Sequence, residues 1–403
     1  MNPESTISYN KKSVEDIQVG GKKVLLRCDF NVPFDKTTGK ITDPGRIIAA
    51  LPTIKYLISH GAAVIACSHF GRPKGEVKPD LSLAPVAKCL AGYLVQPVKM
   101  AKDVVGPDAV KLAAELQPGE VMLLENTRFH KEEEKNDPEF AKKLADMADI
   151  FVSDAFGTVH RAHATTVGVS AYLPAVSGFL LKKELDYIGG AISDPKRPLV
   201  TILGGAKVSD KLGVIGNLLK SADSIIIGGG MAYTFIKAEG GKIGDSLCED
   251  AEIENVRELK EKAKARGVKL LLPHDTIAAA EFSNDAEPVI VETGAIPDDM
   301  MGLDIGPETV KNFISEIKGA GTIVWNGPMG VFEFSKFAGG TRAIADAVAE
   351  SGAITIIGGG DSAAAIRQFG LEDKITHIST GGGASLEFME GKTLPGIACL
   401  LDA

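Results

Sequence analysis

Short runs of Val, Ile and Leu recur along the chain, and each is followed by a loop and then by a segment with helical spacing. This pattern is typical of parallel strands with both faces covered, because such strands read as continuous apolar runs rather than as an alternation. We therefore predict an α/β protein with parallel sheets. Ligands of open α/β sheets bind beyond the carboxyl ends of the strands, so the loops after these runs are where we expect the chemistry.

The apolar runs separate into two series by the residues in their loops. Loops of the first series carry arginine and histidine, and its strands lie within residues 22–33, 62–73, 121–130 and 150–163. Loops of the second series carry clustered glycines, and its strands lie within residues 201–209, 224–232, 324–333, 355–363 and 377–385. A chain of 403 residues is longer than one hydrophobic core usually grows, so two domains are expected.

A helical segment lies between the two series. In FLLKKELDYIGGAI, residues 179–192, the apolar positions have helical spacing, and SDPKRP follows with two prolines that end the helix. We interpret it as a connecting helix, with Gly189 and Gly190 as its weak points. The segment ENVRELKEKAKARGVKLLL predicts a helix that leads into a strand, and the run Glu132 to Glu134 is interpreted as a solvated surface.

Charge and composition exclude several classes of protein. The net charge is −9, and residues 1–178 carry 22 Lys and Arg against 21 Asp and Glu, so the acidic excess falls on the rest. No basic tract is present, which argues against nucleic-acid binding. The sequence shows no apolar stretch of about 20 residues and no signal-peptide core, so we expect no membrane partner and a cytoplasmic location. The five scattered cysteines contain no CxxC pair and are expected to be reduced.

The glycine loops predict a phosphate site. In TILGGAKVSDKLG, residues 201–213, a strand runs into Gly204 and Gly205 and then into Lys207 and Lys211. Backbone N–H groups of such a turn can approach a phosphate, although GxxxxGK[ST] is absent and this is no Walker A loop. The two lysines are four residues apart, so we expect them on one face of a helix that begins there, where a bound anion would relieve their repulsion. The alternative is two solvated lysines on a helix surface.

Asp361 in GGGDSA has two interpretations. A carboxylate at a helix start is usually an N-cap, a role that Ser362 could share. If phosphates occupy the same edge, however, Asp361 would repel them unless Mg²⁺ lay between. Glu333 in GVFEF could accept hydrogen bonds from both ribose hydroxyls, or be a plain surface glutamate.

The arginine loops predict a small ligand with several negative charges. Guanidinium groups grip carboxylate and phosphate through paired hydrogen bonds, and the cationic residues at the strand ends are Arg46, His69, Arg72, Arg128, His160, Arg161 and His163. Asp29 and Asn31 could then orient a hydroxyl of that ligand. The alternative is that each arginine pairs with a nearby Asp or Glu.

Two other functions stay open at this point. A nicotinamide-dependent dehydrogenase also has glycine turns after strands, but GGGMAYTF lacks the GxGxxG spacing. A non-catalytic two-lobed binding protein would explain the arginines but leaves Lys207, Lys211 and Asp361 without a task. HExxH and GxSxG are absent, so metalloprotease and serine-hydrolase chemistry lack support.

Eight motifs together carry a resemblance to a known family. They are RCDFNVP, SHFGRPKG, LLENTRFHKEEE, DAFGTVHRAHA, LGGAKVSDK, WNGPMGVFE, IGGGDSAAA and STGGGASLE. Their order and spacing resemble those of the phosphoglycerate kinase family over essentially the whole chain.

The resemblance implies two Rossmann-like three-layer αβα domains with parallel sheets, joined by a hinge helix. The first would be residues 1–178 with 393–403, the helix 179–193, and the second 194–392. The first would bind 3-phosphoglycerate or 1,3-bisphosphoglycerate, and the second ADP or ATP with Mg²⁺. The resemblance also implies a monomer.

The site residues that the resemblance implies fall into three groups. The glycerate substrate would be held by Asp29, Asn31, Arg46, His69, Arg72, Arg128 and Arg161. The nucleotide would be held by Gly205, Ala206, Lys207, Lys211, Gly302, Glu333, Gly358, Gly359, Gly360, Asp361 and Ser362, with Asp361 on Mg²⁺. Charge in the reaction would be stabilised by Arg46, Lys207, Lys211 and the amides near Gly381, Gly382 and Gly383. Ser362 stands where the family commonly has threonine, which keeps the hydroxyl.

The implied reaction is the reversible transfer of a phosphoryl group from 1,3-bisphosphoglycerate to ADP. Both acceptors, a phosphate oxygen and a carboxylate, are already anionic, so no general base is needed. Catalysis then reduces to positioning and charge stabilisation.

Overall fold

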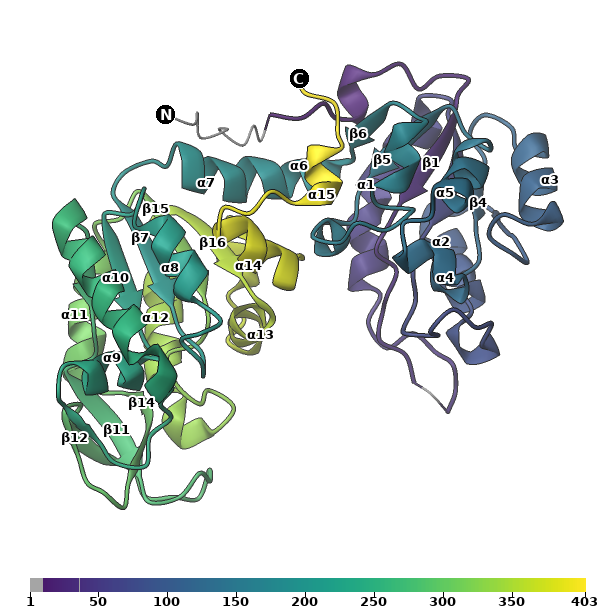
Figure 1. Cartoon of the computed structure of the whole chain (residues 1–403). Helices are drawn as coiled ribbons and strands as arrows, with labels where there is room; N and C mark the ends of the chain where they lie inside the picture. Colours follow the sequence, from purple (N-terminus) through teal and green to yellow (C-terminus); the bar gives the residue numbers. More distant parts are fainter. Residues whose placement is uncertain (1–9, 36) are drawn as a thin grey trace. The chain divides into compact units, whose positions relative to one another are not determined.

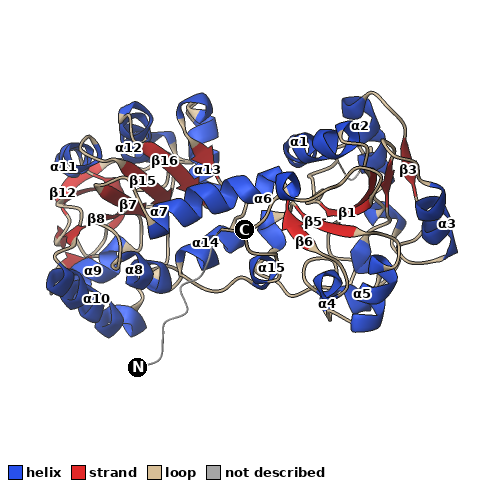
Figure 2. Ribbon diagram, turned by 90° about the horizontal axis from the view of Figure 1, so that it is seen from above, coloured by secondary structure: helices blue, strands red, loops and turns tan. Residues whose placement is uncertain are grey.

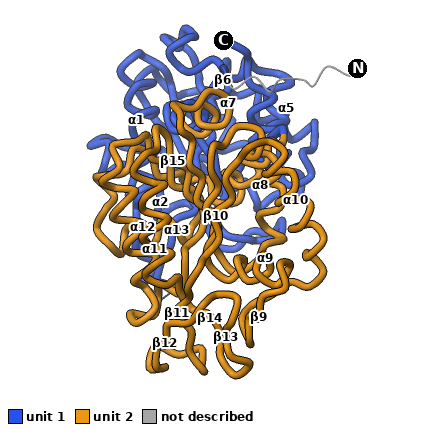
Figure 3. Tube along the Cα trace, turned by 90° about the vertical axis from the view of Figure 1, so that its left-hand side faces the viewer, with its two compact units in different colours: residues 1–186, 393–403 blue, residues 187–392 orange. Residues whose placement is uncertain are grey.

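The computed structural model describes residues 10–35 and 37–403, which form two compact units (Figure 1). Unit 1 contains the described residues up to Asp186 together with Thr393–Ala403, and unit 2 contains Tyr187–Lys392 (Figure 3). Each unit is built around its own parallel sheet with helices on both faces (Figure 2). The predicted α/β class with two parallel sheets is therefore confirmed.

The sheet of unit 1 has six parallel strands in the order β3-β4-β2-β1-β5-β6. Their bounds are β1 Lys23–Arg27, β2 Ala63–Cys67, β3 Val98–Met100, β4 Val121–Leu123, β5 Ile150–Ser153 and β6 Ala175–Ser177. Every residue of β2, β4 and β5 is buried, as the continuous apolar runs predict, and every residue of β6 is buried as well. The four strands expected from the first series are confirmed, whereas β3 and β6, three residues each at the two edges, were not predicted.

Helices cover both faces of this sheet (Figure 2). Helices α1 and α2 lie on one face and α4 and α5 on the other, with bounds α1 Gly45–Ser59, α2 Ala84–Leu94, α3 Pro107–Glu115, α4 Lys131–Glu134 and α5 Pro138–Ala145. Ile47 and Ile54 of α1 and Val86 of α2 belong to one buried cluster with the apolar residues of β1 and β2. This packing fixes α1, and hence Arg46 in its first turn, against the sheet.

The main sheet of unit 2 is also parallel, in the order β10-β8-β7-β15-β16-β17. Its strands are β7 Leu199–Leu203, β8 Ser224–Ile227, β10 Lys269–Leu271, β15 Thr322–Asn326, β16 Ile354–Gly358 and β17 His377–Ile378. The five strands of the glycine series are confirmed, and so is the predicted helix-to-strand segment, which forms α10 and β10. Helices α8 Leu212–Leu218, α9 Ala232–Ala238 and α10 Ile253–Arg266 lie on one face, and α11 Pro307–Ile317, α12 Gly339–Glu350 and α13 Gly360–Gln368 on the other.

Two smaller sheets in unit 2 were not predicted. Strands β11 Asp275–Ala279, β12 Val289–Glu292 and β14 Met301–Ile305 form an antiparallel sheet in the order β12-β11-β14. Strand β9 Lys242–Ile243 pairs in parallel with β13 Ala295–Ile296. Strand β14 carries Gly302 and, as shown below, supports a loop that contains another predicted site residue.

The helical segment expected at 179–192 is present, but it is not a uniform α-helix. It consists of α6 Phe179–Glu184, a π-helical turn at Leu185–Gly189, and α7 Gly190–Ser193. The turn includes Gly189, and the boundary between the two units falls within it.

The last residues of the chain pack on unit 1. After α14 Gly383–Met389 in unit 2, the chain forms α15 Pro395–Ala398, where Gly396 N–H donates to the Val159 carbonyl at 2.8 Å. A Cβ at Gly396 would lie 2.8 Å from the Val159 Cα, so the contact requires glycine. Lys11 Nζ lies 2.7 Å from Asp402 Oδ1, which joins the two ends of the chain within this unit.

Candidate active site

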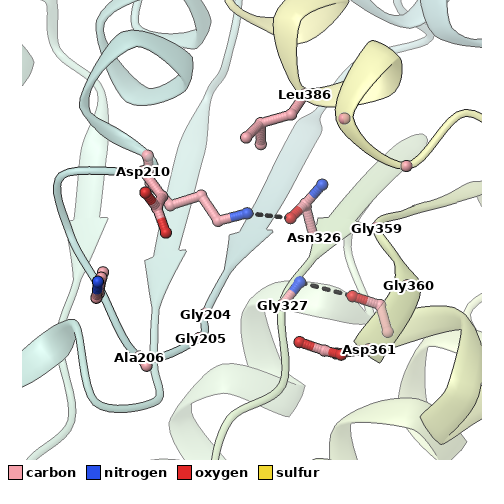
Figure 4. Close-up of a pocket in the computed structure, with 15 residues that line it drawn as sticks. Gly204, Gly205, Ala206, Asp210, Asn326, Gly327, Gly359, Gly360, Asp361 and Leu386 are labelled. Carbon is pink, nitrogen blue, oxygen red and sulfur yellow. Dashed lines mark hydrogen bonds between the residues drawn. The ribbon is translucent and has the colours of Figure 1, made fainter. Parts of the chain in front are cut away.

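A pocket of about 440 Å³ lies at the carboxyl edge of the parallel sheet of unit 2. Figure 4 shows its walls, which come from the loops after β7, β15, β16 and β17. The lining residues are Gly204, Gly205, Ala206, Lys207, Asp210, Lys211, Asn326, Gly327, Gly359, Gly360, Asp361, Ser362, Gly382, Gly383 and Leu386. The structure therefore brings together loops more than 100 residues apart in the sequence, as expected for the ends of parallel strands.

Two glycines make the shape of this pocket possible. A Cβ at Gly204 would lie 2.1 Å from the Pro328 carbonyl oxygen, so only glycine lets the segment after β15 cross the end of β7. Gly359 is the N-cap of α13 and has a φ of 87°, which L side chains rarely adopt. With no side chain at either position, a ligand in the pocket can approach the backbone closely.

The two predicted lysines line the same pocket, but not from one helix face. Helix α8 begins at Leu212, with Lys211 as its N-cap, and Lys207 lies in the preceding loop. The expectation of a helix that begins at Lys207 is therefore wrong. Residues 204–207 are held by the crossing segment, since Gly204 N–H donates to the Asn326 carbonyl at 3.0 Å and Gly205 N–H to the Pro328 carbonyl at 3.1 Å.

Lys211 and Asn326 form a polar pair inside the pocket. Lys211 Nζ donates to Asn326 Oδ1, the bond that the dashed line to Asn326 marks in Figure 4. Burial lowers the pKa of the Lys211 ammonium, and the neighbouring Asp210 and Asp361 act in the opposite direction. Asn326 is 3% exposed, and its buried Nδ2 has no hydrogen-bond partner in the described part of the chain. Buried donors without a partner are uncommon in folded proteins, so this amide is a candidate contact for a ligand of the pocket.

Asp361 and Ser362 do not cap α13. No side chain caps this helix; Asp361 lies exposed in its first turn at the pocket wall. Ser362 is fully buried, and its Oγ accepts a hydrogen bond from Gly327 N–H at 2.6 Å. The capping alternative is therefore wrong for both residues, and the Ser362 hydroxyl holds the loop after β15 in place.

Three of the predicted nucleotide residues lie outside this lining. Gly358 is buried at the end of β16, where a Cβ would lie 3.2 Å from Asn326 Nδ2. Gly302 lies in β14, and a Cβ there would be 1.9 Å from the Tyr233 hydroxyl oxygen. Glu333 is exposed on the segment that continues from Gly327 beyond the pocket. The pocket that Lys207 and Lys211 line and the residues expected for the nucleoside are thus distinct parts of unit 2.

In unit 1 the predicted substrate residues follow four strands of one sheet. Asp29 and Asn31 follow β1, His69 and Arg72 follow β2, Arg128 follows β4, and Arg161 follows β5. Asn31 Oδ1 accepts from Gly71 N–H at 2.9 Å, and Arg128 Nη1 donates to the Gly71 carbonyl at 3.1 Å, which joins the first three of these loops. Arg72 and Arg161 are exposed.

Two of the arginines also have acidic partners, as the alternative interpretation expects. Arg46 Nη1 donates to both carboxylate oxygens of Asp29 at 2.9 Å, and Arg128 Nε lies 3.5 Å from Glu134 Oε1. Arg128 is 6% exposed, and burial lowers the pKa of its guanidinium. These pairs hold the cations in place without neutralising the whole cluster.

Arg27 lies beneath this cluster and was missed from the sequence. It is 1% exposed at the end of β1; Nη2 donates to His69 Nδ1 at 3.1 Å and Nε to Thr165 Oγ1 at 2.9 Å. Burial first, and then the positive charge of Arg27, holds the pKa of the His69 imidazole well below its usual range. One feature of the sequence could have indicated Arg27, because it is a charged residue directly after the apolar run of β1.

Glu133 balances this buried guanidinium through Thr165. Its carboxylate is fully buried and accepts from Thr165 Oγ1 at 2.5 Å and from Thr165 N–H at 3.0 Å. The expectation that Glu132 to Glu134 form a solvated surface is therefore wrong for Glu133. Helix α4 places one glutamate of the three inward while its neighbours face solvent.

Replacing Glu133 by alanine is expected to lower the free energy of unfolding by about 3 kcal/mol, since it leaves Arg27 buried without its counter-charge. Urea denaturation measures this loss. Glu132→Ala on the same turn is the matched control, because Glu132 is exposed and should change stability by no more than about 0.5 kcal/mol. Equal effects of the two substitutions would show that the buried network contributes nothing to stability.

Residues 10–35 and 37–403 lack two further kinds of feature. No group of three or more His, Cys, Asp or Glu side chains that could hold a metal ion occurs in these residues. Their helices also include none that is long and apolar enough to cross a membrane.

Comparison with known proteins identifies similar sequences and structures over nearly the full chain. The family model described as Phosphoglycerate kinase matches residues 14–392. The phosphoglycerate kinase of Clostridium novyi (strain NT) is 60% identical over 399 residues, 98% of this chain and 100% of that protein. The phosphoglycerate kinase of Clostridium botulinum (strain Hall) is 59% identical over the same lengths.

Solved structures agree with the sequence matches. The structure of phosphoglycerate kinase from Coxiella burnetii has a TM-score of 0.91 and 44% identity, and the match covers 96% of this chain and 98% of that one. The phosphoglycerate kinase from Pyrococcus horikoshii OT3 has a TM-score of 0.77 and 35% identity over the same shares.

Proposed function

The chain belongs to the phosphoglycerate kinase family, and we propose that its two sets of loops hold the two substrates of that family's reaction. The enzyme transfers a phosphoryl group reversibly between 1,3-bisphosphoglycerate and ADP, giving 3-phosphoglycerate and ATP. Family membership thus decides against the dehydrogenase and the non-catalytic binding protein.

The nucleotide phosphates bind in the pocket of unit 2. The observation that carries this assignment is the convergence of glycine turns, Lys207, Lys211 and the unpartnered Asn326 amide on one cavity. Backbone N–H groups of Ala206 and Gly360 are suited to phosphate oxygens, and Gly205, with a φ of 109°, lets the backbone turn beside them. The lysines supply positive charge. The nucleoside lies beyond this pocket, against Gly302, with Glu333 on the ribose hydroxyls.

Asp361 is proposed as the protein ligand of Mg²⁺. Asp361 and Asp210 are both exposed at the wall of this pocket, and Asp361 lies in the first turn of α13. Mg²⁺ usually takes one or two carboxylates together with substrate phosphates and water, so one such carboxylate is enough for this ion. The same preference explains why no cluster of three acidic residues is needed. When bound, the ion neutralises charge on the phosphates.

The glycerate substrate binds to the cationic cluster of unit 1. Arg46, Arg72, Arg128 and Arg161 grip its phosphate and carboxylate groups, and Asp29 and Asn31 orient its hydroxyl. Arg27 donates to His69 Nδ1, so the proton of the neutral imidazole resides on Nε2, which can donate to the anionic substrate. The lowered pKa keeps His69 neutral at pH 7, which suits a hydrogen-bond donor and not a general acid.

Phosphoryl transfer then needs alignment and charge stabilisation. The acceptor oxygens are already anionic, so no proton has to be removed. Arg46, Lys207, Lys211 and the amides of Gly382 and Gly383 offset the negative charge on the transferring group. Each substrate is held by a different unit, and we infer from the family resemblance that a hinge motion brings the two into line. We expect this motion at the π-helical turn Leu185–Gly189, because π-helical turns are frequent at functional sites and the boundary between the two units falls within this one.

A coupled assay with 3-phosphoglycerate and ATP tests the metal assignment. We expect activity to disappear with a chelator and to return with Mg²⁺. Asp361→Asn is expected to raise the Mg²⁺ concentration for half-maximal activity about tenfold, as expected for the loss of one charged ligand.

The matched comparison for this test is Asp210→Asn, the other carboxylate that lines the pocket. It should leave the Mg²⁺ requirement within about twofold of the wild type, since the loss of a charge without a metal contact weakens binding little. If Asp210→Asn needed more Mg²⁺ and Asp361→Asn needed no more than the wild type, Asp210 would be the metal ligand.

Family membership also supports a monomeric enzyme in the cytoplasm. Sedimentation velocity tests whether the enzyme is a monomer.

A further inference from the structure

Asp304 is a buried carboxylate in β14 that the proposed chemistry does not use. It is 2% exposed and forms no ion pair within the part of the chain that the structure describes. Oδ2 accepts from Gly340 N–H at 2.7 Å, in the first turn of α12, and Oδ1 accepts from Ile305 N–H at 2.9 Å. Burial raises the pKa of this carboxyl to about 7, so stability alone does not favour a charged group here.

The Asp304 carboxylate lies against both ends of one segment, residues 330–340. A Cβ at Gly330 or at Gly340 would lie 2.3 Å from Asp304 Oδ1. Between these glycines, Val331 N–H donates to the Leu303 carbonyl of β14 at 2.8 Å. The segment is therefore attached to β14 at both of its ends, and larger side chains at either glycine would push it away.

This attachment joins two parts of the proposed nucleoside site. Glu333 lies on the attached segment, and Gly302 lies two residues before Asp304 in the strand to which the segment is attached. The segment also continues from Gly327, which lines the phosphate pocket. Met329 lies between Gly327 and the start of this segment, and its N–H donates to the Thr341 hydroxyl of α12 at 3.1 Å. The position of Glu333 relative to Gly302 thus depends on Asp304 and the start of α12.

We propose that Asp304 is a positioning residue for the nucleoside half of the nucleotide, which holds the Glu333 segment in register with Gly302. The proposal rests on the assignment of Gly302 and Glu333 to the nucleoside under Proposed function. Asp304 touches neither the substrate nor the reacting atoms in this account. Its effect should therefore be confined to the affinity for adenosine and should not extend to the phosphates.

The test compares ATP with Mg²⁺-tripolyphosphate, a probe that has the phosphates and no nucleoside. Asp304→Asn turns one of the two acceptors into a donor, so one backbone N–H loses its partner. We expect the KM for ATP to rise about tenfold, the effect of one lost hydrogen bond. The Ki for tripolyphosphate, the KM for 3-phosphoglycerate and kcat should stay within about twofold, because nothing that holds the phosphates has changed.

Asp275→Asn is the matched control for a purely structural effect. Asp275 in β11 accepts from Glu308 N–H at 3.0 Å and Thr309 N–H at 2.8 Å at the start of α11, and it lies against Gly306 as Asp304 lies against Gly340. Helix α11 carries no proposed nucleotide residue. Asp275→Asn should therefore lower Tm without a change in the KM for ATP.

The proposal is overturned by an unchanged KM for ATP in Asp304→Asn, or by an equal loss of tripolyphosphate affinity. If Asp304→Asn does not fold, Gly330→Ala is used instead, because its added methyl group displaces the segment from Asp304 while the carboxylate is kept. The KM for ATP and the Ki for tripolyphosphate are then compared in the same way. Glu333→Gln separates this inference from its premise. A normal KM for ATP in Glu333→Gln beside a raised one in Asp304→Asn would remove Glu333 from the ribose while leaving Asp304 to act through Gly302.

Discussion

Replacing Arg46 by alanine is expected to lower kcat about 100-fold, equivalent to about 3 kcal/mol of transition-state stabilisation. Arg46 lies in the first turn of α1, where a cation opposes the helix dipole, and its guanidinium is held by both oxygens of Asp29. We propose that a group positioned in this way donates to charge that develops on the transferring phosphoryl group. Steady-state kinetics in both directions of the reaction measure the loss.

Lys55→Ala is the matched control for Arg46→Ala, because Lys55 is an exposed cation on the same helix. It should leave kcat within about twofold of the wild type, as expected for a surface substitution. Arg46→Lys keeps the charge and loses the paired geometry, so an intermediate kcat is expected. A folded Arg46→Ala enzyme with near-normal turnover would remove this arginine from the mechanism.

Replacing Lys207 by alanine is the second substitution for which a loss of about 100-fold in kcat is expected. Lys207 is exposed in the loop before α8 and lines the phosphate pocket, whereas Lys211 is partly buried and is held by Asn326. We propose that the exposed ammonium of Lys207 follows the phosphoryl group between its two acceptors. Single-turnover measurements separate this chemical step from product release.

Lys220→Ala serves as the comparison for Lys207→Ala. Lys220 is exposed just after α8, at the opposite end of this helix from the pocket. Its loss changes the net charge of unit 2 by the same amount and should leave single-turnover rates unchanged within about twofold. Equal losses in the two variants would mean that the rate depends on the general charge of the unit and not on contact with the phosphoryl group.

Hydrophobic patterning predicted the fold wherever strands are buried on both faces. All nine apolar runs with glycine or arginine loops became parallel strands, because burial on two faces leaves an unbroken apolar signal. The strands of the antiparallel sheet β12-β11-β14 are not marked by such an apolar run followed by a glycine or arginine loop. Strand β12 is a short β-branched run, but Val289, Ile290 and Glu292 are exposed, so its residues do not mark a strand buried on both faces. The π-helical turn likewise leaves no mark in the apolar spacing.

The predictions for the site were limited by contacts between distant parts of the chain. Glycine and lysine clusters predict a phosphate site from each loop separately, and the residues of these clusters line one pocket of unit 2. Asn326 is a site residue through its burial and its bond to Lys211, 115 residues away, which no local pattern reveals. Glu133 became a core residue because Arg27 and Thr165 meet it in the fold. Lys207 fell outside the helix because the crossing segment after β15 holds its loop open.

A double-mutant cycle of Arg46→Ala and Lys207→Ala tests the central claim, that residues from both units act on one transferring phosphoryl group. If they do, their effects are coupled, and the double variant should lose about 100- to 1,000-fold in the chemical step. Losses that multiply to about 10,000-fold would show that the two residues act independently and would contradict the account.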